Sequence, residues 1–236
     1  MADPLSRRDL LRLGAAAAPA LLATACGWDG GPLLRPRLDA AARLNDRVGQ
    51  LLFSTDRLAR TYPESARSPR MPTYWTAKVM PEVADPDAWR LPVGGLVQAP
   101  LTLSLAMLQQ MPSVTYTVKH HCVEGWTAIA TWTGVPLATI VQAVQPLARA
   151  EYVRFDSFDA GYHNGWDLPS TMHPQTILAY AWNGQPLAPA RGAPVRLYSP
   201  VKLGYKLTKY LSAITFTDQR PGGYWEDQGY PWFGGV

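Results

Sequence analysis

Short segments of alternating or continuous apolar residues follow one another along the chain, and each predicts a short element. β-branched and aromatic residues are concentrated at 114–118 and 151–158, which favours strands. A helical rhythm places Leu105, Leu108 and Met111 on one side of residues 101–111. Further strands are predicted over residues 89–97, 176–182, 194–198 and 213–217, and a further helix over residues 137–144.

Pro, Gly and Asn separate these segments. Pro112 is predicted to end the first helix, residues 132–136 to form a turn, and Asn183-Gly184 to form a hairpin. Residues 46–72 and 159–170 are expected to be irregular. Many short strands with few short helices predict an α+β fold dominated by β structure in a single domain.

The N-terminus has the pattern of a targeting segment. Arg7-Arg8 precedes an apolar run, residues 13–25, that is too short to span a bilayer comfortably. The run ends in an A-x-A cleavage pattern before Cys26, which is also compatible with lipid attachment. We therefore predict a twin-arginine export signal over residues 1–25, a tether over 26–45 and the domain over 46–236. The alternative is an uncleaved amphipathic helix.

An exported chain would be periplasmic, either free or anchored to lipid through Cys26. The composition is globular, with 47% apolar and 17% charged residues. The net charge of +4 is mild and no Lys/Arg run is present, so nucleic acid is not an expected partner.

Only two cysteines occur, and Cys122 would be the single thiol left if Cys26 is removed or lipidated. It follows Lys119-His120-His121 and a predicted strand, so it is expected in a loop. Three interpretations stay open for it: a soft metal ligand, a nucleophile, or a small buried side chain. Zinc is disfavoured, because the sequence has no C-x-x-C or H-x-x-x-H pair.

A second group of residues is basic. Arg191, Arg196, Lys202, Lys206 and Lys209 alternate with glycines and aromatics, a pattern that suits a phosphate group or a solvated basic edge. No G-x-G-x-x-G or P-loop sequence is present, which disfavours a Rossmann dinucleotide or ATP site.

A third group lies in the predicted long loop and just after it. His163, Asn164, Asp167 and His173 could line a pocket or could bind the backbone of their own loop. No C-x-x-C-H sequence is present, so no covalent haem is expected in this chain.

Taken in order, several segments resemble the molybdopterin-binding domain of the sulfite oxidase family over roughly residues 51–232. They are WRLPVGGLV at 89–97, KHHCVEGW at 119–126, WTGVPL at 132–137, HPQT at 173–176, NGQPL at 183–187, GAPVR at 192–196 and GYK at 204–206. The resemblance implies a sulfite-oxidase-type molybdopterin-binding fold with mixed sheets and short helices.

The resemblance also implies a molybdenum–molybdopterin cofactor, one per chain, with Cys122 as the thiolate bound to the metal. Arg191 departs from the family pattern, which has Asn or His there, although an arginine could still reach a phosphate. Trp126 and His163 are the residues expected to contact substrate. The residues expected to contact the cofactor are Tyr74, Ser157, Arg191, Arg196, Lys206, Leu207, Thr208 and Lys209.

The implied reaction is oxygen-atom transfer. Val123-Glu124-Gly125-Trp126 follows the cysteine without the arginine that helps sulfite oxidases bind sulfite, and it is similar to the exported protein-methionine-sulfoxide reductase catalytic subunits. Reduction of a small-molecule or peptidyl sulfoxide is therefore the leading expectation, and sulfite oxidation the second. Other classes stay open: a thiol hydrolase with His121 as base, or a cofactor-binding module without catalysis.

Two expectations concern partners. Because the chain has no haem or iron–sulfur ligand pattern of its own, electrons are expected from a membrane haem protein or a soluble cytochrome. A monomer is expected, because the C-terminal dimerisation domain of sulfite oxidases is not seen in the sequence.

Overall fold

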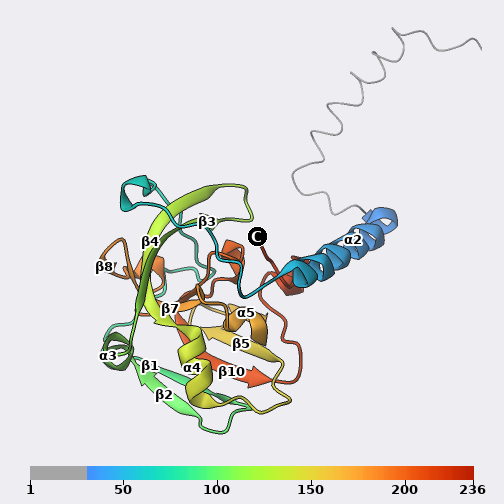
Figure 1. Cartoon of the computed structure of the whole chain (residues 1–236). Helices are drawn as coiled ribbons and strands as arrows, with labels where there is room; N and C mark the ends of the chain where they lie inside the picture. Colours follow the sequence, from blue (N-terminus) through green and yellow to red (C-terminus); the bar gives the residue numbers. More distant parts are fainter. Residues whose placement is uncertain (1–30) are drawn as a thin grey trace, which may run out of the picture. The chain divides into compact units, whose positions relative to one another are not determined.

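The structure is a computed structural model that describes residues 31–236, apart from the side chain of Leu33 (Figure 1). The chain separates into two units, Met1–Arg43 and Leu44–Val236. The predicted export signal and Cys26 lie outside the described residues. No helix among residues 31–236 is long and apolar enough to cross a membrane.

The first sheet joins the beginning and the end of the domain. β1 (Arg90–Gly95) lies parallel to β10 (Leu211–Thr217), although more than a hundred residues separate them. The other neighbouring strands of this sheet are antiparallel. Its order is β2 (Leu101–Ser104), β1 (Arg90–Gly95), β10 (Leu211–Thr217), β5 (Tyr152–Ser157) and β6 (His163–Asp167).

The second sheet is built around one long hairpin of β3 (Val114–His121) and β4 (Thr127–Pro136), which Figure 1 shows as two curved green strands. The hairpin pairs through β4 with β7, and β7 in turn pairs with β8 and β9. The strands are β3 (Val114–His121), β4 (Thr127–Pro136), β7 (Ile177–Trp182), β8 (Gln185–Pro186) and β9 (Arg196–Tyr198).

Short helices complete the domain. The described α-helices are α2 (Gly31–Leu52), α3 (Leu105–Gln110), α4 (Leu137–Val144) and α5 (Leu168–Thr171). The 3-10 helices are Glu64–Ala66, Pro189–Arg191, Gly204–Lys206 and Glu226–Gln228. α4 buries four apolar side chains spaced three and four residues apart, the spacing that places residues on one helical face: Leu137, Ile140, Val141 and Val144.

The predicted α+β class is confirmed, and several elements lie where the apolar pattern placed them. α4 covers the predicted helix at 137–144, and β5, β7 and β10 cover predicted strands. Asn183 and Gly184 both have positive φ, at 51° and 80°, as the two-residue hairpin between β7 and β8 requires.

Two segments have a different secondary structure from the one predicted. Residues 101–104 form strand β2 instead of the first turn of a helix, and Ser104 then caps α3 by accepting a hydrogen bond from the Met107 N–H. Residues 132–136 continue β4 instead of turning, because Gly134 lets the backbone of β7 approach closely at a bulge.

Two irregular segments are also more regular than predicted. Residues 163–171 form β6 and α5, and the Asp167 side chain caps α5. The predicted tether is helical from residue 31, and α2 continues to Leu52. Within α2, the Asp46 carboxylate accepts hydrogen bonds from the N–H groups of Trp232 and Phe233 at 2.6 and 3.0 Å. β6 pairs with the preceding strand β5 although its residues are mostly polar, and only the Asp46 contacts of α2 come from residues distant in sequence.

Candidate active site

Cys122 lies in the tight turn of the β3–β4 hairpin, directly after the strand end as predicted. Its N–H donates to the Trp126 carbonyl at 3.0 Å, and its carbonyl accepts from the Gly125 N–H at 3.1 Å. Gly125 has φ +88°, a conformation that side chains disfavour. The two longest strands of the sheet thus hold the thiol in place.

A cavity of about 370 Å³ opens beside this thiol. It is formed by residues from several segments that the fold brings together: the β3–β4 hairpin, residues 71–76, the end of β5, residues 191–209 and the C-terminal segment. Of the predicted site residues, those that line it are Tyr74, Cys122, Trp126, Ser157, Arg191, Arg196, Leu207 and Lys209.

Three basic side chains line the cavity. Arg196 is buried and donates to the Leu207 and Arg191 carbonyls, both at 3.1 Å. Burial lowers the pKa of Arg196 to about 10. Burial, together with the positive charge of Arg196, lowers the pKa of Lys209 to about 7. Among residues 31–236 the guanidinium groups of Arg191 and Arg196 have no carboxylate partner, so an anionic ligand would stabilise these partly desolvated cations.

Several buried polar atoms beside the cavity have no hydrogen-bond partner among the described residues. They include Arg191 Nη1, Thr208 Oγ1 and His120 Nδ1. Arg191 Nη2 already donates to the Met71 carbonyl at 2.8 Å, which aims the guanidinium without satisfying it. Buried donors left unpaired cost free energy, so these atoms indicate a polar ligand.

One side of the cavity is organised by hydroxyl and carboxylate groups. Ser157 Oγ donates to the Lys209 carbonyl at 2.8 Å and accepts from the Asp159 N–H at 3.0 Å. Asp159 is buried and accepts from the N–H groups of Thr76 and Ala77 at 2.8 and 2.7 Å. Lys209 Nζ donates to the Tyr74 carbonyl. Residues 74–77 are thereby held over the cavity.

An acidic side chain lies next to the thiol. Glu124 Oε2 is 4.0 Å from Cys122 Sγ and accepts a hydrogen bond from Trp126 Nε1 at 3.0 Å. A hydrogen bond to Glu124 is the largest cause that raises the pKa of the Tyr74 phenol. Glu124, Trp126 and Tyr74 therefore surround the accessible side of Cys122.

The imidazoles near the thiol are poor bases. Burial is the main cause that lowers the pKa of His120 to about 3, and burial also lowers the pKa of His121. His120 lines the cavity, whereas His121 does not. Burial raises the pKa of the Cys122 thiol, so its surroundings within residues 31–236 do not activate it as a free nucleophile.

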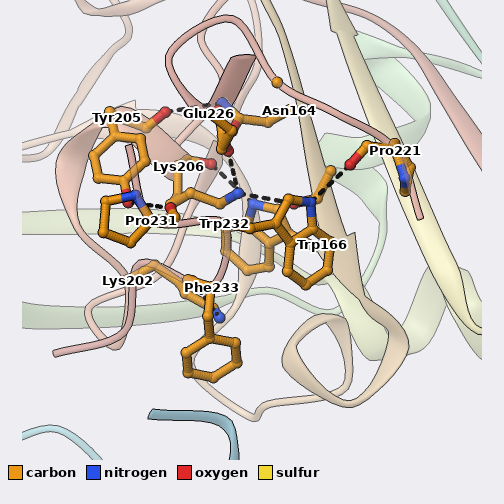
Figure 2. A network of polar contacts seen from close by, with 12 residues as sticks. Asn164, Trp166, Lys202, Tyr205, Lys206, Pro221, Glu226, Pro231, Trp232 and Phe233 are labelled. Carbon is orange, nitrogen blue, oxygen red and sulfur yellow. Dashed lines mark hydrogen bonds and ion pairs between the residues drawn. The ribbon is translucent and has the colours of Figure 1, made fainter. Parts of the chain in front are cut away.

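Three predicted site residues, Lys206, Thr208 and His163, lie outside the cavity lining. Lys206 Nζ donates to the Gly165 carbonyl at 2.8 Å and forms an ion pair with Glu226 (Figure 2). His163 lies 3.8 Å from Asp227 and contacts the Gly161 carbonyl through Nδ1. Nothing in these contacts points Lys206 or His163 towards the cofactor or the substrate.

The third group of residues mostly binds nearby backbone. His173 Nδ1 accepts from the Gln175 N–H at 3.1 Å, Asp167 caps α5, and Asn164 donates to the Tyr205 carbonyl at 2.8 Å. His173 and Asp167 thus bind backbone groups of their own segment, whereas Asn164 binds a carbonyl that is distant in sequence.

The sequence reasoning missed several cavity residues, of which Glu124, Asp159, Trp225 and Tyr230 are the main ones. Glu124 could have been inferred from its position two residues after the thiol in a Gly-containing turn. The other three gave no local signal, because they reach the cavity only through tertiary contacts.

No group of three or more His, Cys, Asp or Glu side chains in residues 31–236 could hold a metal ion. A metal at Cys122 would therefore have to arrive with most of its ligands already bound. Comparison with known families decides which group this is, since residues 77–225 match the family described as oxidoreductase molybdopterin binding domain.

The chain belongs to this family. It is an oxidoreductase with a molybdopterin-binding domain, as the resemblance over roughly residues 51–232 predicted. A protein of Azospira oryzae, named as subunit YedZ1 of a protein-methionine-sulfoxide reductase, is 40% identical over 91% of this chain and 82% of its own length.

Other relatives match a smaller part of this chain. The MsrP catalytic subunits of protein-methionine-sulfoxide reductase from Ralstonia nicotianae and Xanthomonas axonopodis are 35% and 34% identical over 59% of this chain. The match covers 47% and 48% of these two relatives, so the chain spans about half the length of each. The sulfane dehydrogenase SoxCD of Paracoccus pantotrophus matches at a TM-score of 0.56 and 21% identity, over 60% of this chain and 41% of that one. This likeness confirms the predicted fold.

The cavity fits a molybdopterin cofactor. A phosphate would satisfy the basic side chains of Arg191, Arg196 and Lys209, which line the cavity. Cys122, which lines the cavity, would supply one soft thiolate, and this suits a thiophilic metal that is otherwise coordinated by its own cofactor. A bound metal would also offset the raised pKa of the Cys122 thiol, because coordination deprotonates a thiol.

Proposed function

We propose that this protein reduces sulfoxides by oxygen-atom transfer at a molybdenum centre bound to Cys122, with one cofactor per chain. The substrate is a peptidyl methionine sulfoxide or a similar small sulfoxide. The names of the YedZ1 and MsrP relatives support this substrate class. The overall reaction balances as sulfoxide plus two electrons and two protons giving thioether and water.

The observation that carries the choice of substrate is the position of Glu124. Its carboxylate lies 4.0 Å from Cys122 Sγ, and both residues line the cavity. An anion such as sulfite would be repelled there, whereas a neutral, dipolar sulfoxide would not. Sulfite oxidation is therefore the weaker candidate.

The protein's own residues have separate tasks in this proposal. Arg191, Arg196 and Lys209 bind the anionic part of the cofactor, and Cys122 binds the metal. Trp126, held by its hydrogen bond to Glu124, limits where the substrate can lie. When bound, the cofactor supplies the centre that accepts the oxygen atom and delivers two electrons.

The same proposal includes the protein's surroundings. Export by the twin-arginine route would place a folded, cofactor-loaded chain in the periplasm, free or anchored through Cys26. A membrane haem protein or a soluble cytochrome would supply the electrons, and the protein would act as a monomer.

A thiol hydrolase is disfavoured by the same site. His121 does not line the cavity, and His120 has a pKa lowered to about 3 by burial, so neither imidazole is a competent base for Cys122. The raised pKa of the Cys122 thiol also argues against a hydrolase, because it lowers the fraction of nucleophilic thiolate.

The test uses protein produced in a host that makes the cofactor. We expect stoichiometric molybdenum and turnover of methionine sulfoxide, free and within a peptide, with a reduced viologen dye as electron donor. Cys122→Ser should lower the molybdenum content by more than about tenfold. Cys26→Ser, which changes the other thiol, should leave the molybdenum content unchanged.

Three outcomes would contradict the proposal. Metal-free protein with thiol-dependent ester cleavage would indicate a hydrolase. Bound cofactor without turnover of any sulfoxide or sulfite would indicate a binding module. Faster oxidation of sulfite than reduction of every sulfoxide would reverse the assignment of substrate.

A further inference from the structure

We infer that the C-terminal segment, residues 221–236, builds a specificity wall that selects sulfoxides bearing an alkyl side chain. The wall consists of Trp225 and Tyr230 from this segment together with Tyr205, and all three line the cavity beside Cys122. The inference rests on the proposed sulfoxide reduction and adds the residues that choose among sulfoxides.

The three rings form one continuous surface. The ring centroids of Trp225 and Tyr230 are 5.2 Å apart, and those of Tyr230 and Tyr205 are 5.4 Å apart. Both distances are in the range of favourable aromatic pairs, so each ring restrains the next. The wall therefore acts as a unit, not as three independent side chains.

The chain returns on itself to make this surface. The 3-10 helix Glu226–Gln228 ends at Gly229, whose φ of +99° is accessible to glycine. The Tyr230 N–H then donates to the Trp225 carbonyl at 3.1 Å. The family match ends at residue 225, so Tyr230 lies beyond the region that defines the family.

A buried ion pair holds this turn against the domain. Lys206 Nζ contacts Glu226, and the side chains are only 1% and 4% exposed (Figure 2). The Lys206 Nζ also donates to the Gly165 carbonyl at 2.8 Å, which ties the turn to β6. Lys206 and Glu226 are thus positioning residues, because Glu226 directly follows Trp225.

Further bonds hold the segment on either side of the turn. Tyr205 Oη donates to the Pro231 carbonyl at 2.5 Å, and Trp232 Nε1 donates to the Pro221 carbonyl at 2.7 Å. Lys202 Nζ donates to the Phe233 carbonyl at 2.8 Å. Figure 2 shows these groups converging on one buried network. A surface held this firmly is organised before the substrate binds.

The chemistry of the wall suits a particular part of the substrate. Aromatic rings contact alkyl groups and polarizable sulfur favourably, whereas they offer little to a small, strongly hydrated solute. A methionine sulfoxide side chain has methylene groups to lay on such a surface, and dimethyl sulfoxide has almost none. The wall should therefore act mainly on the binding of the longer substrate.

The first test compares Trp225→Ala and Tyr230→Ala with the unaltered, cofactor-loaded enzyme. For N-acetylmethionine sulfoxide we expect KM to rise by about tenfold or more, with little change in kcat. KM for dimethyl sulfoxide should change much less. Trp225→Phe and Tyr230→Phe retain a ring and should restore most of the discrimination, and Gln228→Ala, an exposed change in the same turn, should leave it unchanged.

The second test addresses the positioning residues without leaving an unpaired buried charge. The double variant Lys206→Met with Glu226→Gln removes both charges together. We expect it to raise KM for N-acetylmethionine sulfoxide as the wall variants do, with unchanged molybdenum content. Calorimetric binding of the thioether N-acetylmethionine, which needs no turnover, should weaken in parallel.

The outcomes separate this inference from the proposed function. Equal effects on both sulfoxides, or no effect on either KM, would overturn the wall. Weakened thioether binding in the wall variants of an enzyme that reduces no sulfoxide would overturn the proposed function and support the wall.

Discussion

Arg191 shows how a single residue can depart from a family pattern and still fit the site. Its guanidinium lies over the Trp182 ring, 4.2 Å from the centroid, and is aimed by the bond to the Met71 carbonyl. Its Nη1 is buried and has no hydrogen-bond partner in the described part of the chain. Burial also lowers the pKa of Arg191, which an anionic ligand would reverse.

We therefore predict that Arg191→Met weakens cofactor retention. A hydrogen bond to a charged group contributes about 1.5–3 kcal/mol, which corresponds to a loss of about tenfold or more in affinity. Molybdenum and pterin content after extended gel filtration measures this. The control is Arg154→Met, which changes an arginine whose side chain is 42% exposed and paired with Asp156. Equal retention in both variants would exclude Arg191 from the cofactor site.

Glu124 is a second single residue with a proposed role, the selection of sulfoxide over sulfite. Glu124→Gln keeps an oxygen that can accept from Trp126 but removes the negative charge beside Cys122. We predict a several-fold rise in the ratio of sulfite oxidation to sulfoxide reduction. Steady-state rates with both substrates measure it, with Glu64→Gln, a change at an exposed surface position, as the control. An unchanged ratio would remove Glu124 from substrate selection.

At the scale of elements, the β3–β4 hairpin positions the thiol, and β4 depends on close contact with β7. A Cβ at Gly134 would collide with the Leu178 backbone and lie 2.7 Å from Ala179 Cα. The predicted turn at 132–136 was wrong for this reason: the glycine serves a tertiary approach and not a change of direction.

We predict that Gly134→Ala destabilises the domain by about 1–3 kcal/mol, the usual cost of overpacking. Gly94→Ala is the matched control in β1, because its Cβ would meet only Pro100 Cβ at 3.9 Å. Chemical denaturation of both variants measures the difference. Equal free energies of unfolding would contradict the proposed close approach.

At the scale of the whole molecule, buried lysines make stability depend on pH. Burial lowers the pKa of Lys202 from its ordinary 10.5 to about 7, and Lys206 and Lys209 are lowered as well. Between pH 7 and 10 the unfolded chain binds more protons on these groups than the folded chain does. The free energy of unfolding therefore rises with pH in this window and is lowest below pH 7.

We predict a slope of up to about 1.4 kcal/mol per pH unit for each such lysine, measured by denaturation between pH 6.5 and 9.5. Lys202→Met places an unbranched apolar side chain among the rings of Phe53, Trp166 and Phe233 and should reduce the slope. Lys78→Met, at an exposed position, should not. A slope unaffected by Lys202→Met would show that this lysine is not charged at a cost in the folded state.

By itself, the sequence determined the fold class, the helix at 137–144, the hairpin at 183–184 and the thiol that follows a strand. These features depend on local periodicity, turn chemistry and ordered motifs, all of which are properties of residues close together in the sequence. The ordered motifs also led to the family, and with it to the cofactor and most of the basic residues of the cavity.

Only the tertiary structure decided which side chains meet at that thiol. Lys206 and Lys209 are three residues apart, yet one lies in a buried ion pair with Glu226 and the other lines the cavity. Trp225 and Tyr230 reach the cavity because that ion pair and a turn in the C-terminal segment bring them there. Burial and pairing between segments distant along the chain depend on packing, and a local pattern carries no record of them.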